Sequence, residues 1–190
     1  IELALKDITG GKAVVFIDPH GQSTDTLLSH VPQERRDDVI HFDLGDYDFP
    51  IAWNPLHDVP KRARAHTASL LLDAFRAANK YTHLSTPDFN LTLYSAIAAL
   101  LDRKGGTLLS VPYLITSEEH RRHVVGHVRD PVVKDIWRQF DDLDERDRQQ
   151  ITKSTRTNMT LLMADPRVRN VLGQARSAFS IKDIYRKKRI

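Results

Sequence analysis

An apolar run ends in two side chains that could do chemistry. Residues 13–17, AVVFI, lead directly into Asp18-Pro19-His20-Gly21. A carboxylate and an imidazole therefore stand at the carboxyl end of a predicted buried strand, which is where open parallel sheets bind ligands. Asp18 could hydrogen-bond the water around Mg²⁺, because hard cations recruit oxygen ligands. Alternatively, Asp18 caps the following turn and His20 is a surface turn residue.

A group of cations near the end of the chain is the second candidate site. Its members are Arg148, Lys153, Arg156 and Arg169. They lie in a stretch that predicts two consecutive helices, 144–164 and 165–173, and could form one patch that contacts phosphates. Five acids between positions 141 and 147 dilute the positive charge. Direct DNA contact, contact with a protein, and an ordinary solvated surface all remain open.

Three histidines could bind a metal ion if they shared one face of a helix. They are His120, His123 and His127, spaced at i, i+3 and i+7. A transition metal would accept two imidazoles placed in this way. However, no cysteine is nearby, Arg121 and Arg122 adjoin, and Gly126 weakens the helix. The pattern therefore favours a solvated polar face, and we predict no metal site.

The composition limits the class of protein. The chain has 190 residues, of which 41% are hydrophobic and 28% charged, so it can bury a core. Its net charge of +3 is compatible with a nucleic-acid partner but does not require one. The absence of cysteine excludes disulfides and favours a reducing compartment. No apolar run approaches the roughly 18 residues needed to cross a bilayer.

The elements that would position these residues change character along the chain. The first part predicts a helix, a strand at 13–17, a short helix at 23–30 and a second strand at 37–44. This order is typical of an α/β fold with parallel strands. Beyond a loop at 45–56, only helical patterns follow.

The helical part predicts a bundle. Its expected helices lie at 61–80, 130–143, 144–164 and 165–173. A further helix starts at Thr86-Pro87-Asp88 and continues through 90–104, and another begins near Thr116 or Ser117. We therefore divide the chain into an α/β portion at 1–57, an all-α domain at 58–175 and a return segment at 176–190. Because the chain begins at Ile1 with a helical pattern, we expect it to be a segment of a longer protein. We expect Trp53 and Trp137 to be core or domain-junction anchors.

Several short motifs occur in a distinctive order. They are Asp18-Pro19-His20-Gly21, Asp38-Val39-Ile40, Phe42-Asp43, Asn54-Pro55-Leu56, and DPRVRNVLGQ at 165–174. Their order and spacing resemble the HerA–FtsK-like motor ATPases, most closely the conjugative coupling proteins and related type IV secretion ATPases. In that family a helical domain is inserted into a RecA-like core at this point. The resemblance covers most of the chain.

The resemblance implies a fold and a function. The fold would be a partial RecA-like P-loop NTPase core of the α/β class with an inserted all-α helical domain. The parent protein would use ATP and Mg²⁺, form a homo-hexamer on the cytoplasmic, inner face of a bacterial membrane, and contact secretion-channel proteins. The helical insert would recognise DNA or protein–DNA cargo. Asp18 and His20 would be accessory residues near the γ-phosphate of the nucleotide.

The chain also departs from the family pattern. Gln22 stands where the family has an acid. Gly11-Lys12 does not complete the phosphate loop G-x-x-x-x-G-K-[ST], because Lys6 and Ala13 occupy its first glycine and hydroxyl positions. The paired acids of a Walker B strand are missing as well. The resemblance implies that both motifs lie elsewhere in the parent protein, so we expect no catalytic residue and no bound cofactor in this chain alone.

Two other functions remain open from the sequence. One is a non-enzymatic helical binding module with an α/β scaffold. The other is a HerA-type DNA-processing translocase with no role in secretion.

The missing phosphate loop gives a first prediction. The chain should neither hydrolyse ATP nor bind it saturably, because it lacks the lysine and the backbone N–H groups that hold the phosphates. An ATP–Mg²⁺ titration by calorimetry measures this. A micromolar dissociation constant would contradict our interpretation of the Gly11-Lys12 segment.

Overall fold

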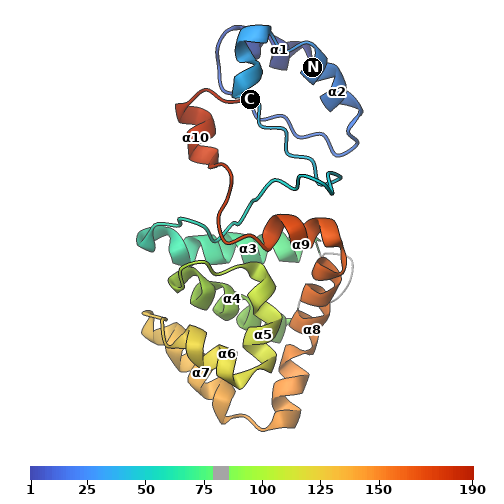
Figure 1. The fold of residues 1–190 in the computed structure, drawn as a ribbon. Helices are drawn as coiled ribbons and strands as arrows, with labels where there is room; N and C mark the ends of the chain where they lie inside the picture. The colour runs from blue at the N-terminus through green and yellow to red at the C-terminus, as the bar shows by residue number, and fades with distance from the viewer. Residues whose placement is uncertain (79–85) are drawn as a thin grey trace. The chain divides into compact units, whose positions relative to one another are not determined.

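The structure, a computed structural model, describes residues 1–78 and 86–190. The described chain forms α-helices and short 3₁₀ helices (Figure 1). In chain order they are α1 (Glu2–Thr9), α2 (Gln22–Ser29), η1 (Gln33–Asp38), η2 (Lys61–Ala63), α3 (Arg64–Ala78), α4 (Pro87–Asp102), η3 (Leu108–Ser110), α5 (Val111–Thr116), α6 (Glu118–Val125), α7 (Pro131–Asp142), α8 (Glu145–Ala164), α9 (Pro166–Leu172) and α10 (Ile181–Arg186). These elements divide into two compact units, 1–43 with 178–190, and 44–177.

The predicted α/β fold, and with it a RecA-like core, is wrong for the described residues, which contain no strand. Residues 13–17 are irregular, and the segment predicted as the second strand begins inside η1. A few backbone bonds join both segments to the chain end. Val14 N–H donates to Arg189 (3.1 Å), Ile40 N–H donates to Ile190 (2.8 Å), and Ile190 N–H donates to Asp38 (2.9 Å). A strand requires a ladder of such bonds with a neighbour, and these segments lack one.

The first unit has a small apolar core. Ile8 of α1, Leu27 of α2 and Val31 are buried, and Val14 and Val39 pack against them. The apolar run at 13–17 contributes little else to this core, because Val15 is 60% exposed and Ile17 is 83% exposed. Its hydrophobic sequence therefore does not mark a buried strand here.

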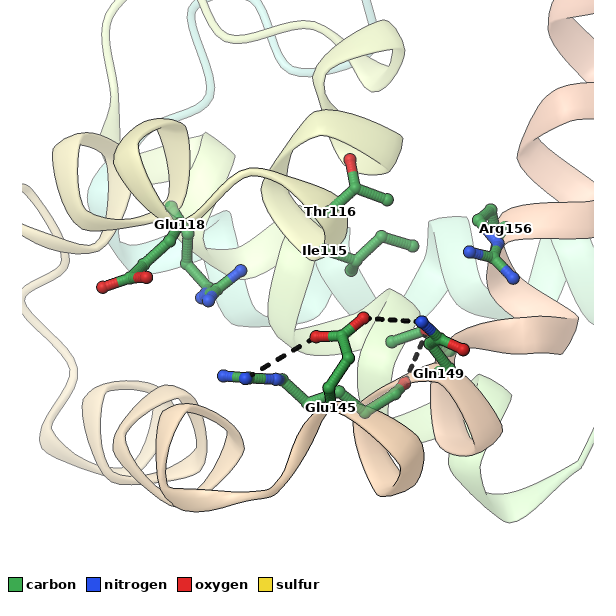
Figure 2. Close-up of a pocket in the computed structure, with 9 residues that line it drawn as sticks. Ile115, Thr116, Glu118, Glu145, Gln149 and Arg156 are labelled. Carbon is green, nitrogen blue, oxygen red and sulfur yellow. Dashed lines mark hydrogen bonds and ion pairs between the residues drawn. The ribbon is translucent and has the colours of Figure 1, made fainter.

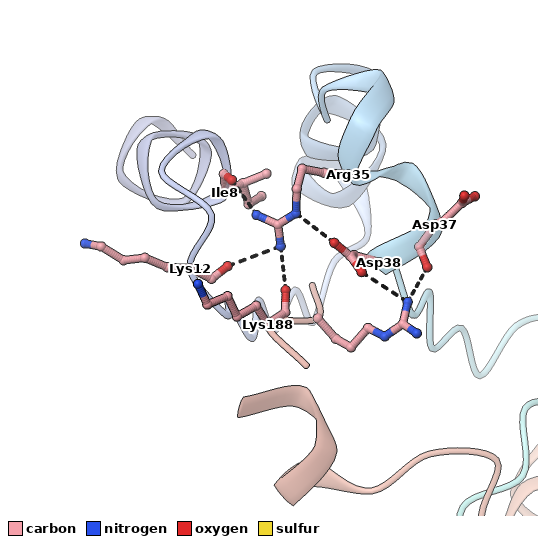
Figure 3. Close-up of polar contacts among 7 residues, drawn as sticks. Ile8, Lys12, Arg35, Asp37, Asp38 and Lys188 are labelled. Carbon is pink, nitrogen blue, oxygen red and sulfur yellow. Dashed lines mark hydrogen bonds and ion pairs between the residues drawn. The ribbon is translucent and has the colours of Figure 1, made fainter. Parts of the chain in front are cut away.

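Arg35 holds the segments of this unit together (Figure 3). Its guanidinium donates to the carbonyl oxygens of Ile8 (2.6 Å), Lys12 (3.4 Å) and Lys188 (2.5 Å), and to the carboxylate of Asp38 (2.9 Å). Only 12% of its side chain is exposed. One cation thus binds three carbonyl groups, two at or just beyond the end of α1 and one near the end of the chain.

The second unit is built around α4, which lies among other helices in Figure 1. Thr86 caps this helix by accepting a hydrogen bond from Phe89 N–H (3.1 Å), and Pro87 occupies its first turn. The buried residues of α4 are Phe89, Thr92, Leu93, Ser95, Ala96, Ile97, Ala99, Leu100 and Leu101. They cover most of the circumference of the helix, with Leu91 exposed on the remaining side, and α3, α5, α7 and α8 pack against it. The all-α architecture predicted for this part of the chain is confirmed.

Two polar anchors fix the surroundings of α4. Trp137 of α7 is 1% exposed and donates its indole N–H to the carbonyl oxygen of Ser95 (3.3 Å). Asn54, also buried, donates to Gly106 (2.9 Å) and Ala175 (3.2 Å) and accepts from Leu56 N–H (2.9 Å). The Asn-Pro-Leu motif therefore ties the start of this unit to its end.

The predicted helix starts agree with the structure where a local cap exists. Asp130 caps α7, Asp144 caps α8 and Asp165 caps α9, each through its carboxylate. The predicted helix at 61–80 corresponds to η2 and α3, and its last two residues lie outside the described part of the chain. Within the described part, no helix has the length and apolar character needed to span a membrane.

The Arg35 contacts give a second prediction. Arg35→Met should destabilise the first unit by about 2–3 kcal/mol, because three carbonyl groups and the Asp38 carboxylate lose their charged donor. Hydrogen exchange of the α1 and α2 amides measures the effect. Arg36→Met is the matched control, since Arg36 is an exposed neighbour on the same 3₁₀ helix. Equal protection in the two variants would show that Arg35 does not hold this unit together.

Candidate functional site

Asp18 acts as a cap in this structure. One carboxylate oxygen accepts from His20 N–H (3.0 Å), and the other accepts from Ser23 N–H (2.8 Å) and Thr24 N–H (3.0 Å). Gly21, with a φ of 81°, makes the turn that brings the start of α2 to this carboxylate. The hydrogen bond from His20, together with those from Thr24 and Ser23, lowers the pKa of Asp18.

These bonds occupy both carboxylate oxygens of Asp18 with backbone groups of its own turn. His20 contributes its backbone N–H, and its exposed imidazole has no hydrogen-bond partner in the described chain. The arrangement matches the turn-capping interpretation of Asp18. A role for Asp18 and His20 near a nucleotide stays a prediction about the parent protein.

Helix α8 carries the predicted cations and has an uneven charge distribution. Its first turn contains Glu145 and Asp147, which are favourable near a helix N-terminus. From Arg148 to its end at Ala164, the helix has no acidic residue. Beyond Arg148, which contacts Glu145, the positive charge of this stretch is therefore not balanced along the helix itself.

One exposed face of α8 is rich in groups that bind phosphate. We define the α8 outer face as Lys153, Arg156, Thr157 and Thr160, which are all exposed. Their spacing of i, i+3, i+4 and i+7 places them on one side of the helix. Neither Lys153 nor Arg156 has an ion-pair partner in residues 1–78 and 86–190. The face offers two available cations beside two hydroxyl groups.

A hollow of about 300 Å³ lies beside this face, between α5, α6 and α8 (Figure 2). We call it the arginine hollow. It is lined by Ile115, Thr116, Glu118, Arg121, Glu145, Arg148, Gln149, Thr152 and Arg156. Three of these are arginines and two are glutamates. Arg156 belongs to both the hollow and the α8 outer face, so the two features are continuous.

Arg121 is the buried cation of the hollow. It is 3% exposed, and its Nε donates to the Asp141 carboxylate (2.6 Å) while Nη1 donates to the Leu114 carbonyl oxygen (3.2 Å). Its guanidinium also lies over the Phe140 ring, 4.9 Å from the centroid. These contacts from α5 and α7 fix the orientation of the guanidinium.

Arg148 is held more loosely than Arg121. Its Nη2 lies 3.6 Å from the Glu145 carboxylate, and its Nη1 lies 3.4 Å from the Asp141 carbonyl oxygen. Both distances exceed the roughly 2.7–2.9 Å typical of charged hydrogen bonds, and the contact with Glu145 is too long to be a hydrogen bond. Arg148 can therefore reorient toward a ligand at little cost.

The structure does not bring the four predicted cations into one patch. Arg148 and Arg156 both line the hollow, and Lys153 lies beside Arg156 on the outer face. Arg169 of α9 instead donates to the carbonyl oxygens of Met163 (2.6 Å) and Ala164 (3.2 Å), at the C-terminal end of α8. This end is about 22 Å along the helix from Arg148, at 1.5 Å per residue.

The three histidines do not form a metal site in the described residues, where no group of three metal-binding side chains is found. His123 and His127 are ring neighbours, with centroids 5.2 Å apart. His120 instead lies near Tyr113, and its buried Nε2 has no partner in the described chain. Burial, followed by the charge of Arg103, lowers the pKa of His120.

Sequence reasoning missed Arg121 and Glu145 as parts of a site. One feature of the sequence pointed to Arg121, because its spacing of three from Val124 places it on the apolar side of α6. A charged residue on such a side is rarely buried without a partner. That partner, Asp141, lies twenty positions further along the chain, so local pattern could not identify it.

Comparison with protein-family models, with curated proteins and with solved structures gives no match to this chain. The candidate site therefore rests on its own geometry and charge.

The Asp18 contacts give a third prediction. Asp18→Asn should lower the melting temperature of the first unit at pH 7, because an amide cannot reproduce a carboxylate that accepts at both oxygens. The pKa of Asp18 is lowered in the folded chain, so its stabilisation is complete above about pH 4 and disappears as pH falls through the lowered pKa.

Thermal melts from pH 7 down to about pH 2 test this expectation. The difference between the native chain and Asp18→Asn should be constant above pH 4 and should shrink below it. Asp25→Asn is the control, since Asp25 lies in the same first turn of α2 and is exposed. A difference that does not change with pH would contradict the capping role of the charge.

Proposed function

We propose that residues 44–177 are the nucleic-acid-recognition part of a DNA-transfer machine of the conjugation or type IV secretion class. The observation that carries the proposal is the α8 outer face, where Lys153 and Arg156 have no ion-pair partner in the described chain and lie beside Thr157 and Thr160. Cations interleaved with hydroxyl groups are typical of contacts to phosphate.

The charge pattern supports an extended polyanion as the ligand. The helix from Arg148 to Ala164 has no carboxylate that would repel a chain of phosphates. Gln150 is also exposed on α8 and adds a neutral donor. Contacts to phosphates carry no sequence information, so the binding expected for this face is independent of sequence.

The resemblance to conjugative coupling proteins supplies the wider setting of the proposal. In that setting the parent is a motor ATPase and this chain is one segment of it. ATP with Mg²⁺ binds to other parts of the parent. DNA or a protein–DNA complex is the cargo, the parent is a homo-hexamer at the inner face of the membrane, and the helical unit contacts the cargo before transfer.

Salt dependence tests the proposal. The chain should bind a short fluorescent oligothymidylate, and its affinity should fall steeply as salt rises, because each neutralised phosphate releases counterions. Lys153→Ala with Arg156→Ala should flatten the slope of log affinity against log salt by about one unit per lost contact. Fluorescence anisotropy at several salt concentrations measures both quantities.

The control removes the same charge elsewhere in the unit. Lys104→Ala with Lys134→Ala takes away two exposed cations outside α8 and should leave the slope nearly unchanged. An equal effect of both double variants would indicate attraction to net charge alone. Absence of binding at low salt would contradict the proposal and favour a protein-docking role for this unit.

A further inference from the structure

The arginine hollow has a binding capacity that the protein itself does not use. Its neutral donors are already engaged, because Thr116 donates to the Pro112 carbonyl oxygen (2.8 Å), Thr152 to that of Arg148 (2.7 Å), and Gln149 to the Glu145 carboxylate (2.7 Å). The guanidinium groups are the charged donors with unused N–H groups. A ligand of the hollow must therefore be an acceptor that suits guanidinium groups, which are carboxylates and phosphates.

The three arginines differ in how much they can offer. Arg121 uses Nε and Nη1 on its own unit, and its Nη2 has no hydrogen bond to the described residues. Arg148 makes two long contacts, and Arg156 makes no ion pair in the described chain. The hollow thus combines a fixed cation deep in the structure with two adjustable cations on α8.

The charge of the hollow selects a monoanion. Three arginines and two glutamates give the lining a net charge of +1. The ion-pair partners outside the lining cancel, because Asp141 pairs with Arg121 and Arg122 pairs with Glu118 (3.2 Å). A doubly charged phosphate monoester would exceed the available positive charge, whereas a phosphodiester carries a single negative charge and matches it.

We infer that the arginine hollow binds one phosphodiester group of a nucleic-acid strand that runs along the α8 outer face. This inference rests on the proposed function and adds a defined position for one phosphate. Arg156 and Arg148 contact the phosphate. Arg121, held by Asp141 and Phe140, donates a further hydrogen bond from Nη2. An isolated carboxylate of a protein is less well matched, because Arg156 connects the hollow to a face that carries further available cations.

Glu145 is the competitor of the ligand in this arrangement. Its carboxylate lies 3.6 Å from Arg148 and is 71% exposed, so it holds Arg148 weakly and repels an incoming phosphate. Removing its charge should release Arg148 and strengthen binding. On a general basic surface, removing any nearby acid would have a similar effect. An effect specific to Glu145 would therefore distinguish the hollow from such a surface.

The test uses the full 190-residue chain and a short fluorescent oligothymidylate. Glu145→Gln should raise the affinity about two- to fivefold, on the scale of one exposed ion pair. Glu119→Gln is the matched control, because Glu119 is an exposed acid of α6 outside the lining, and it should leave the affinity unchanged. Arg148→Gln should lower the affinity and reduce the salt slope by about one unit.

Two further outcomes separate this inference from the proposed function. If Lys153→Ala weakens binding while Glu145→Gln and Arg148→Gln match the native chain, the outer face binds nucleic acid and the hollow does not hold a phosphate. If inorganic phosphate binds the chain tightly while the oligothymidylate does not bind, the hollow accepts a free dianion and the phosphodiester assignment is wrong. Circular dichroism of each variant checks that the helices remain folded.

Discussion

The helical unit depends on one constraint, which is that α4 must be covered on almost all sides. Its buried residues include Phe89, Leu93, Ile97 and Leu100, and even Ser95 is inaccessible. A helix that is apolar around most of its circumference cannot lie at a surface. Helices α3, α5, α6, α7 and α8 therefore pack against it, each with one side toward α4 and another side facing away from it.

Helix α8 shows how this constraint creates a binding surface. It packs against α4 and α5, and its buried side includes Thr155 and Met159. The opposite side is free of core residues and carries Lys153 and Arg156. Where α5 ends and the chain turns into α6, the covering is incomplete, and the arginine hollow lies there. The candidate site follows from packing geometry, with Arg156 at its centre.

The sequence predicts those features of the fold that depend on neighbouring residues. Thr86-Pro87, Asp130-Pro131 and Asp165-Pro166 each combine a capping side chain with a proline that fits the first turn, so these helix starts can be predicted locally. The strand at 13–17 could not be established in this way. A strand is stabilised by a partner elsewhere in the chain, and in the described structure the run makes one such backbone bond, from Val14 N–H to Arg189.

The candidate site was predictable only in part for the same reason. The cations of α8 are visible in the sequence, but their grouping depends on distant contacts. Arg169 is drawn to the end of α8 by the Met163 and Ala164 carbonyl oxygens, and Arg121 enters the hollow because Asp141 and Phe140 hold it. Such contacts join residues from different helices, which helical periodicity does not specify.

The central claim is that α8 presents the surface that meets nucleic acid. A titration of the ¹⁵N-labelled chain with oligothymidylate at low salt, followed by amide chemical shifts, tests it directly. The account predicts that the largest shifts fall on α8 between Arg148 and Leu161, with smaller ones on α5 and α6 around the hollow. Shifts centred on α3 or α7 with α8 unchanged would contradict it.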